Sequence, residues 1–463
     1  MQKGSILERF RKTKQELIEH QDGIKTAFQM AWPSVLESFF VALAGMVDSL
    51  MVSALGAYAV AAVGLTTQPK FIGLCIFIAL NVAVSALVAR RKGEEKRKEA
   101  NQILLVALLI VLILGTVISI VCVVFAEPIM KLAGAEADTL QPSADYFKII
   151  MGGMMFNIIT LTINAAQRGS GNTKITMKTN ITANVVNMIG NYLLIEGHFG
   201  FPAWGIKGAA IATVFGTVIA CFMAVKSICT RDTFISIPYI WEEKIRPKFQ
   251  NLKSIVHISS TVFAEQLLMR VGFLAVALMA ADMGTNDFAA HQVAMNLLSL
   301  SFSFGDGFQV AAVSLIGQSL GRKAPEQAKF YGTVCRYMGL IVSLILSLLY
   351  ILGGRAYFNL YFREAEIVEI GVRIMRIMPV IVILQVSQII YMGCLRGAGD
   401  VRFAMIASTI SVTMVRPIAS YLFCYTFGFG LVGIWMGLIA DQFSRYMFTS
   451  TRFRAGKWTS IQI

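Results

Sequence analysis

The sequence predicts an all-α polytopic membrane protein with twelve transmembrane helices in two homologous six-helix lobes, related by an axis along the membrane normal. Three observations predict this fold class: a strongly apolar composition, long apolar stretches with short polar turns between them, and a second half that repeats the first. Of the 463 residues, 56% are hydrophobic and 15% are charged, with a mean hydropathy of +0.66. Soluble globular proteins are far less apolar, so we expect a membrane protein.

The apolar stretches are long enough to cross a membrane as helices, which takes about 20 largely apolar residues. Runs such as ILLVALLIVLILGTVISIVCVVF at 103–125 do not alternate in polarity, as the strands of a transmembrane barrel would. In chain order, the predicted helices occupy residues 28–54, 60–89, 102–125, 144–166, 175–196, 206–229, 254–281, 288–320, 331–353, 372–395, 403–425 and 429–450.

The polar segments predict the domain organisation. The first 27 residues lack the short apolar core of a secretory signal peptide, so we expect a cytoplasmic arm, with an interfacial helix as one form of it. The predicted units are the N-terminal arm 1–27, the N-lobe 28–229, a cytoplasmic inter-lobe linker 230–253, the C-lobe 254–450 and a cytoplasmic tail 451–463.

The net charge of +14 has a distribution typical of membrane topology. Lysine and arginine concentrate in the arm, the even-numbered loops and the tail, and they are sparse in the odd-numbered loops. This asymmetry predicts a multi-pass protein of the plasma or inner membrane with both termini in the cytoplasm. Because lipid and topology explain the positive charge, we expect no nucleic-acid partner.

The absence of catalytic motifs from the sequence argues against an enzyme. The seven cysteines form no Cys-x-x-Cys pair, the four histidines lie far apart, and neither a nucleophile elbow nor a phosphate loop is visible. We therefore predict no catalytic residues and no enzyme cofactor.

An internal repeat explains the two similar turns QRGSGNTK at 167–174 and LRGAGDVR at 395–402. An offset of 228 residues pairs Arg168 with Arg396, and it also pairs Glu37 with Glu265. Without a gap it further pairs Gly56 with Gly284, Ala62 with Ala290, Val82 with Val310, Ala83 with Ala311, Gly93 with Gly321, and the FGF at 199–201 with that at 427–429. Six helices per half, an even number, predict parallel repeats. Two interpretations of the turn stay open: a tight bend with a cation at the headgroups, or a gate.

Ionisable residues inside the apolar stretches are the candidate site residues, because each one at the membrane centre costs about 2.5–3.5 kcal/mol or more. Glu37 and Asp48 are eleven residues apart, which places them on one helix face and roughly 16 Å apart along the axis. The register partner of Asp48 is Val276, so the lobes differ in chemistry. Arg270 is a candidate counter-ion for Glu265, and Asp441 and Arg445 are expected to pair at a spacing of four.

The helix at 175–196 carries a stripe of asparagines at spacings of four, three and four, which puts all of them on one face: Asn180, Asn184, Asn187 and Asn191. Such a face contacts protein or water rather than lipid. It either holds helices together by hydrogen bonds or lines a pathway.

Several motifs together resemble the multidrug and toxic compound extrusion (MATE) family, especially its bacterial NorM-type members, over all twelve helices. They are WP with VDSLMVSALG on the first helix, NYLLIEGHFGFPAWGIKGAAIAT, the twin RGxG turns and LVGIWMGLIADQ. The resemblance implies a V-shaped pair of lobes and cation-coupled efflux. Its cation-binding positions match Asp48, Asn187, Asn191, Thr213 and Glu265 here. Two family acids are absent: Gln385 stands where NorM-type members carry Asp, and Asn191 where archaeal members carry an acid.

The predicted function is an antiporter that exports amphipathic, often cationic drugs and toxic compounds by rocking-lobe alternating access. Protons are favoured over Na⁺ as the coupling ion, and Na⁺ at Asp48 is the one metal candidate. The expected partners are membrane lipids and small-molecule substrates. We expect a monomer. The substrate-cavity candidates are Glu37, Asn184, Gln266, Gln385, Gln388, Asp306 and Arg416. The alternative is a flippase for a lipid-linked precursor, which would need a strongly basic cavity.

Overall fold

The computed structural model describes residues 3–231 and 233–461, which form helices joined by short loops, with no strand in these ranges. The first half contains α1 (Lys3–Ser53), α2 (Ala57–Gly93), α3 (Arg97–Val124), α4 (Ala126–Leu132), α5 (Leu140–Gly152), α6 (Met154–Gly169), α7 (Thr173–Leu194) and α8 (Gly205–Ile228). After α9 (Ile237–Glu242), the second half contains α10 (Phe249–Asp282), α11 (Thr285–Gly321), α12 (Pro325–Tyr361), α13 (Ala365–Ala398), α14 (Val401–Thr409), α15 (Arg416–Tyr421) and α16 (Gly430–Ala455). The predicted arm, linker and tail also include residues 1–2, 232 and 462–463, which lie outside the described ranges.

Each of the twelve predicted apolar stretches coincides with helical structure. The fourth is the pair α5 and α6, bent by 46°, and the eleventh is α14 and α15 with π-helical turns at Ile410–Val415 and Leu422–Thr426. By length and composition, eight helices of the described ranges could cross a membrane, or nine if the bent pair is one span. The helices α7, α13 and α16 are not among them, so the count of twelve spans stays a prediction.

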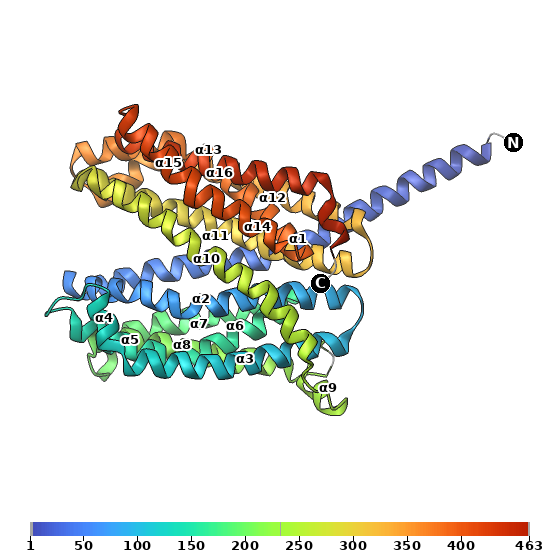
Figure 1. Ribbon diagram of the computed structural model, residues 1–463, viewed down its shortest axis with the longest axis horizontal. Coiled ribbons are helices and arrows are strands. Elements are labelled where there is room, and N and C mark those ends of the chain that lie inside the picture. Colours follow the sequence, from blue (N-terminus) through green and yellow to red (C-terminus); the bar gives the residue numbers. More distant parts are fainter. Residues whose placement is uncertain (1–2, 232, 462–463) are drawn as a thin grey trace.

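The two lobes each have a hydrophobic core of their own, and Figure 1 shows them one above the other. In the first lobe, α2, α3, α5 and α6 pack around Phe77, Phe147 and Ile158. In the second lobe, α11, α12, α13 and α16 pack around Phe358 and Trp435. The predicted two-lobe, all-helical fold class is confirmed.

Two repeat-related helices, α1 and α10, cross from one lobe to the other. Midway along α1, Ala31 lies in the core of the second lobe, whereas Val52 at the end of the helix packs in the first lobe. Conversely, α10 places Ile258 in the core of the first lobe and Val276 in that of the second. The first 27 residues are not a separate element in the described range, because α1 continues through them and extends away from the bundle (Figure 1).

The lobes touch along the repeat axis at the end of the bundle where the chain termini lie, which we call the termini side. A Cβ atom on Gly321 would lie 2.8 Å from the Cα atom of Gly93, and one on Gly317 would lie 2.7 Å from the Cβ atom of Ala89. Both contacts join positions 228 residues apart, and equivalent positions can touch only where the axis passes between them. Small residues let the α2 and α11 backbones approach closely, so the lobes are closed against each other on this side.

We predict that cysteines replacing Ala89 and Gly317 form a disulfide under mild oxidation, because their Cβ atoms are within bonding reach after a small backbone shift. Mass spectrometry of the digested protein measures the linked peptide, with the two single variants as controls for crosslinks to native cysteines. Equal crosslinking in the double and the single variants would show that the lobes do not meet here.

Candidate functional site

Asp48 on α1 is held by two asparagines of α7. The side-chain amide of Asn187 donates to Asp48 Oδ2 at 2.8 Å, and that of Asn191 donates to Oδ1 at 2.7 Å. Thr213 of α8 donates its hydroxyl to Asn187 Oδ1 at 3.3 Å. The asparagines are one helical turn apart, so both reach the same carboxylate. The structure thus brings together four of the five predicted cation-binding residues.

The carboxylate of Asp48 has neutral hydrogen-bond donors and, among the described residues, no ion-pair partner. Lys70 of α2 acts on it only through a longer-range electrostatic interaction. Lys70 is not among the predicted site residues. Its position in TTQPKFIG, a lysine inside an apolar stretch, is the sequence feature that could have identified it. The charge of Asp48 is therefore not fixed by a contacting cation.

A side-chain oxygen of Asn191, next to Asp48, is available as a cation ligand. Asn191 is 1% exposed, and its Oδ1 atom has no hydrogen-bond partner in the described part of the chain. It also lines a cavity of about 290 Å³ between α1 and α7, together with Val47 and Leu50. The cavity extends toward the side of the bundle away from the termini, which we call the far side, since Ala54 and Glu196 also line it.

Two buried ion pairs are related by the repeat. Arg168 donates to Glu37 Oε1 at 3.2 Å, and Asn180 donates to the same oxygen at 2.5 Å. In the second lobe, Arg396 donates to both oxygens of Glu265, at 2.8 and 2.9 Å. The arginines of the twin RG turns thus point into the lobes toward carboxylates, and the interpretation of these groups as cations held at the headgroups is wrong.

Arg270, the candidate counter-ion of Glu265, has another contact. Its guanidinium carbon lies 3.6 Å from the ring centroid of Phe71 on α2, a cation–π contact between the lobes. Glu265 pairs instead with Arg396, which lies 131 residues further along the chain. Glu265 and Asp48 therefore differ in their partners: the Glu265 carboxylate contacts an arginine, and the Asp48 carboxylate contacts none in the described residues.

The remaining candidates lie in several places. Arg416 donates through Nε to Asp441 at 3.0 Å, and Asp441 also pairs with Arg445 at 2.7 Å, the second contact being the predicted one. Gln388 donates to Gln442 at 3.3 Å. Gln385 Oε1 and Asn184 Nδ2 are buried without a partner among the described residues, whereas Gln266 and Asp306 are half-buried.

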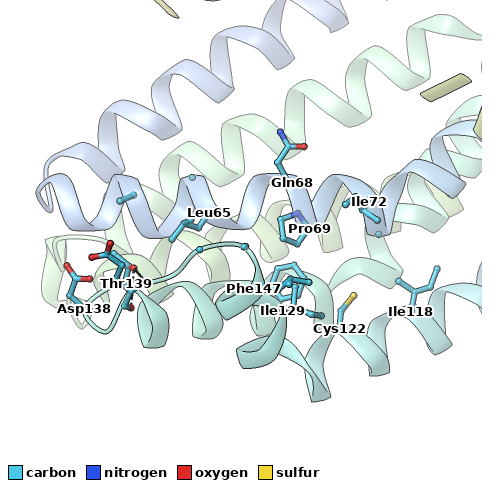
Figure 2. Close-up of a pocket in the computed structure, with 17 residues that line it drawn as sticks. Leu65, Gln68, Pro69, Ile72, Ile118, Cys122, Ile129, Asp138, Thr139 and Phe147 are labelled. Carbon is cyan, nitrogen blue, oxygen red and sulfur yellow. Dashed lines mark hydrogen bonds between the residues drawn. The ribbon is translucent and has the colours of Figure 1, made fainter. Parts of the chain in front are cut away.

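A cavity of about 1080 Å³ lies away from these residues, on the flank of the first lobe. Figure 2 shows Asp138 and Thr139 at one end of it, near the far side, and Ile118 toward the other end. No substrate-cavity candidate lines it. Its lining residues include Leu65, Pro69, Ile72, Cys122, Ile129 and Phe147.

Comparison with known proteins adds a family assignment. The MatE family model matches residues 33–193 and again 262–422, one match in each half of the chain. The chain is 26% identical to the uncharacterized transporter YisQ of Bacillus subtilis over 93% of this chain and 94% of that protein. It is 24% identical to the probable multidrug resistance protein NorM of Thermotoga maritima, over 94% and 93%. A solved structure of an outward-facing multidrug resistance MATE family transporter shares the fold, with a TM-score of 0.87 at 21% identity over 94% of this chain and 97% of the other.

We predict that Glu265→Gln lowers the free energy of unfolding by about 3–5 kcal/mol, because it leaves the Arg396 guanidinium buried without its charge partner. Glu265→Gln combined with Arg396→Gln should lose less, since no unpaired charge remains. Thermal unfolding of the purified protein in detergent measures both, with Glu37→Gln as the matched variant of the other lobe. A double variant less stable than either single variant would contradict the expectation.

Proposed function

The chain belongs to the MatE family, and we propose that it is a multidrug efflux transporter, in which a cation bound at Asp48 drives the export of amphipathic, often cationic compounds. The family match in both halves and the names of the NorM relatives support the transporter class. One observation carries the choice of Asp48: it is a carboxylate held by amides rather than by an arginine.

The partners of the buried acids separate structural roles from a coupling role. Glu37, Glu265 and Asp441 each contact a guanidinium, which stabilises their negative charge in every state in which the pair persists. Asp48 lacks such a contact among the described residues, so its charge can be neutralised by an ion from solution. We therefore place coupling on Asp48 and assign Glu265 to holding α10 against the RG turn of its lobe.

A proton suits this site better than Na⁺. Both asparagines direct donor groups at the carboxylate, and Asn187 Oδ1 is already an acceptor for Thr213. A hard metal cation requires several oxygen ligands at once, and of the two asparagine oxygens Asn191 Oδ1 alone has no partner among the described residues. A proton on Asp48 needs no such set of oxygen ligands.

Alternating access supplies the transport step of the proposal. The lobes are closed against each other at Gly93 and Gly321, so rocking would separate this contact, open the termini side and close the other. An ion drives this change only if it binds the two states with different affinity. Because α1 carries Asp48 and packs in both lobes, neutralising that carboxylate changes the contacts of the helix that joins them. One positive charge moving inward contributes about 2.3 kcal/mol per 100 mV.

The proposal includes orientation and partners. The basic loops and both termini would face the cytoplasm, membrane lipids would surround a monomer, and small molecules would be the substrates. The flippase alternative requires unpaired cations for a phosphate group. Arg168, Arg396 and Arg416 each contact a carboxylate instead, which favours drug export.

We predict that an imposed pH gradient drives dye efflux from proteoliposomes containing the purified protein, and that Asp48→Asn reduces it to the rate of empty liposomes, because an amide cannot take up a proton. Asp145→Asn is the control, since Asp145 pairs with Lys207 near the surface and should leave the rate unchanged. Undiminished pH-driven efflux by Asp48→Asn would refute the role of Asp48. Efflux under a Na⁺ gradient alone would refute the choice of ion.

A further inference from the structure

We propose that Asp306, midway along α11 where α1 and α13 pack against that helix, is a second proton-exchange site distinct from Asp48. The inference rests on the proposed proton coupling and extends it, because it gives the transport cycle a second exchangeable proton. Its basis is the placement of Asp306, the charges around it, and its absence from the other repeat.

The backbone around Asp306 is enclosed between helices of both halves. Gly307 packs directly on α1, where a Cβ atom would lie 2.9 Å from the carbonyl oxygen of Ser34. Gly305 packs on α13, where a Cβ atom would lie 3.1 Å from Cδ1 of Ile389. The glycines on either side of Asp306 thus allow close approach of two helices, while the half-buried Asp306 side chain keeps contact with solvent.

The charged groups that act on Asp306 are those of the repeat-related ion pairs: Arg168 on α6, Glu37 on α1 and Arg396 on α13. One guanidinium nitrogen of Arg396 already donates to both carboxylate oxygens of Glu265 of α10. The group therefore contains three carboxylates and two guanidinium groups, which leaves one negative charge in excess. Excess charge between apolar helices is unfavourable, and a single proton removes it.

One carboxylate oxygen of this charged group has no hydrogen-bond partner among the described residues. Glu37 is 5% exposed, and its Oε1 atom accepts from both Arg168 and Asn180. Its Oε2 atom is buried and has no hydrogen-bond partner in the described residues. A buried carboxylate oxygen without a donor is unfavourable, and a proton added to this group provides the missing donor.

The repeat isolates Asp306 as the extra charge. The two Glu–Arg pairs are equivalent under the 228-residue offset, so each lobe is balanced in itself. The position equivalent to Asp306 is Ile78, as the position equivalent to Asp48 is Val276. Asp48 and Asp306 therefore both lack an acidic counterpart in the other repeat.

The location of Asp306 suits exchange during rocking. It is next to the α1 contact that must change when the termini side opens, so its access to water differs between the two states. Glu37, its charged neighbour, and Asp48 are on the same helix. The two exchange sites are thus joined through α1.

The test measures how many protons are exchanged per dye molecule. In proteoliposomes with the membrane potential clamped at zero, the dye gradient at which net movement stops rises about tenfold per pH unit for each coupled proton. We expect about 100-fold per pH unit for the parent protein and about tenfold for Asp306→Asn. The control Asp282→Asn, whose carboxylate accepts from Tyr425 at the far side, should match the parent. An unchanged gradient in Asp306→Asn would overturn the proposal.

A second measurement does not depend on transport. Infrared spectra of the purified protein record the carbonyl stretch of protonated carboxylic acids, and Asp306→Asn should lose intensity there that Asp48→Asn retains. Identical spectra for the parent and Asp306→Asn would also overturn the proposal. If the parent moves no dye under a pH gradient, the proposed function fails, and the spectra alone decide whether Asp306 carries a proton.

Discussion

The pairing of a buried carboxylate with the arginine of an RG turn is the interaction on which this structure depends. Glu37 with Arg168 and Glu265 with Arg396 fix the two crossing helices, α1 and α10, to the turns at the ends of α6 and α13. Charges inside an apolar bundle are tolerated only when they are compensated, so neither partner can be removed alone without a large loss of stability. Each turn therefore combines a tight backbone bend with an arginine held in an ion pair.

The ion pairs also distinguish the acids that have an arginine partner from those that do not. Once the arginines are assigned to Glu37, Glu265 and Asp441, both Asp48 and Asp306 are half-buried acids with no contacting guanidinium in the described residues. Each is an exception to the repeat symmetry. A scaffold of two equivalent lobes would respond equally to an ion at either side, whereas unpaired acids in different places give the lobes different chemistry. Directional coupling requires such a difference between states.

Because α1 and α10 cross between the lobes, a change at an acid on α1 can affect the packing of both lobes. Because α1 packs in the second lobe near Ala31 and in the first lobe near Val52, it belongs to neither lobe alone. The close contact of α2 with α11 at Gly93 and Gly321 is the one that must separate when the lobes tilt. Interfaces of this kind, made of small residues, separate without unpacking large side chains.

The sequence by itself determined the helices, the repeat and the stripe that joins Asn187 and Asn191, because hydrophobic length and helical periodicity are local properties. It also singled out Asp48 and Glu265, through the rarity of acids in apolar stretches and through family resemblance. Only the tertiary structure decided which acid meets which arginine. The partners lie 131 residues apart in both lobes, and Arg270, five residues from Glu265, contacts Phe71 instead. Sequence spacing cannot predict such contacts, since they are set by how distant helices pack, and that packing separates Asp48 from the paired Glu265.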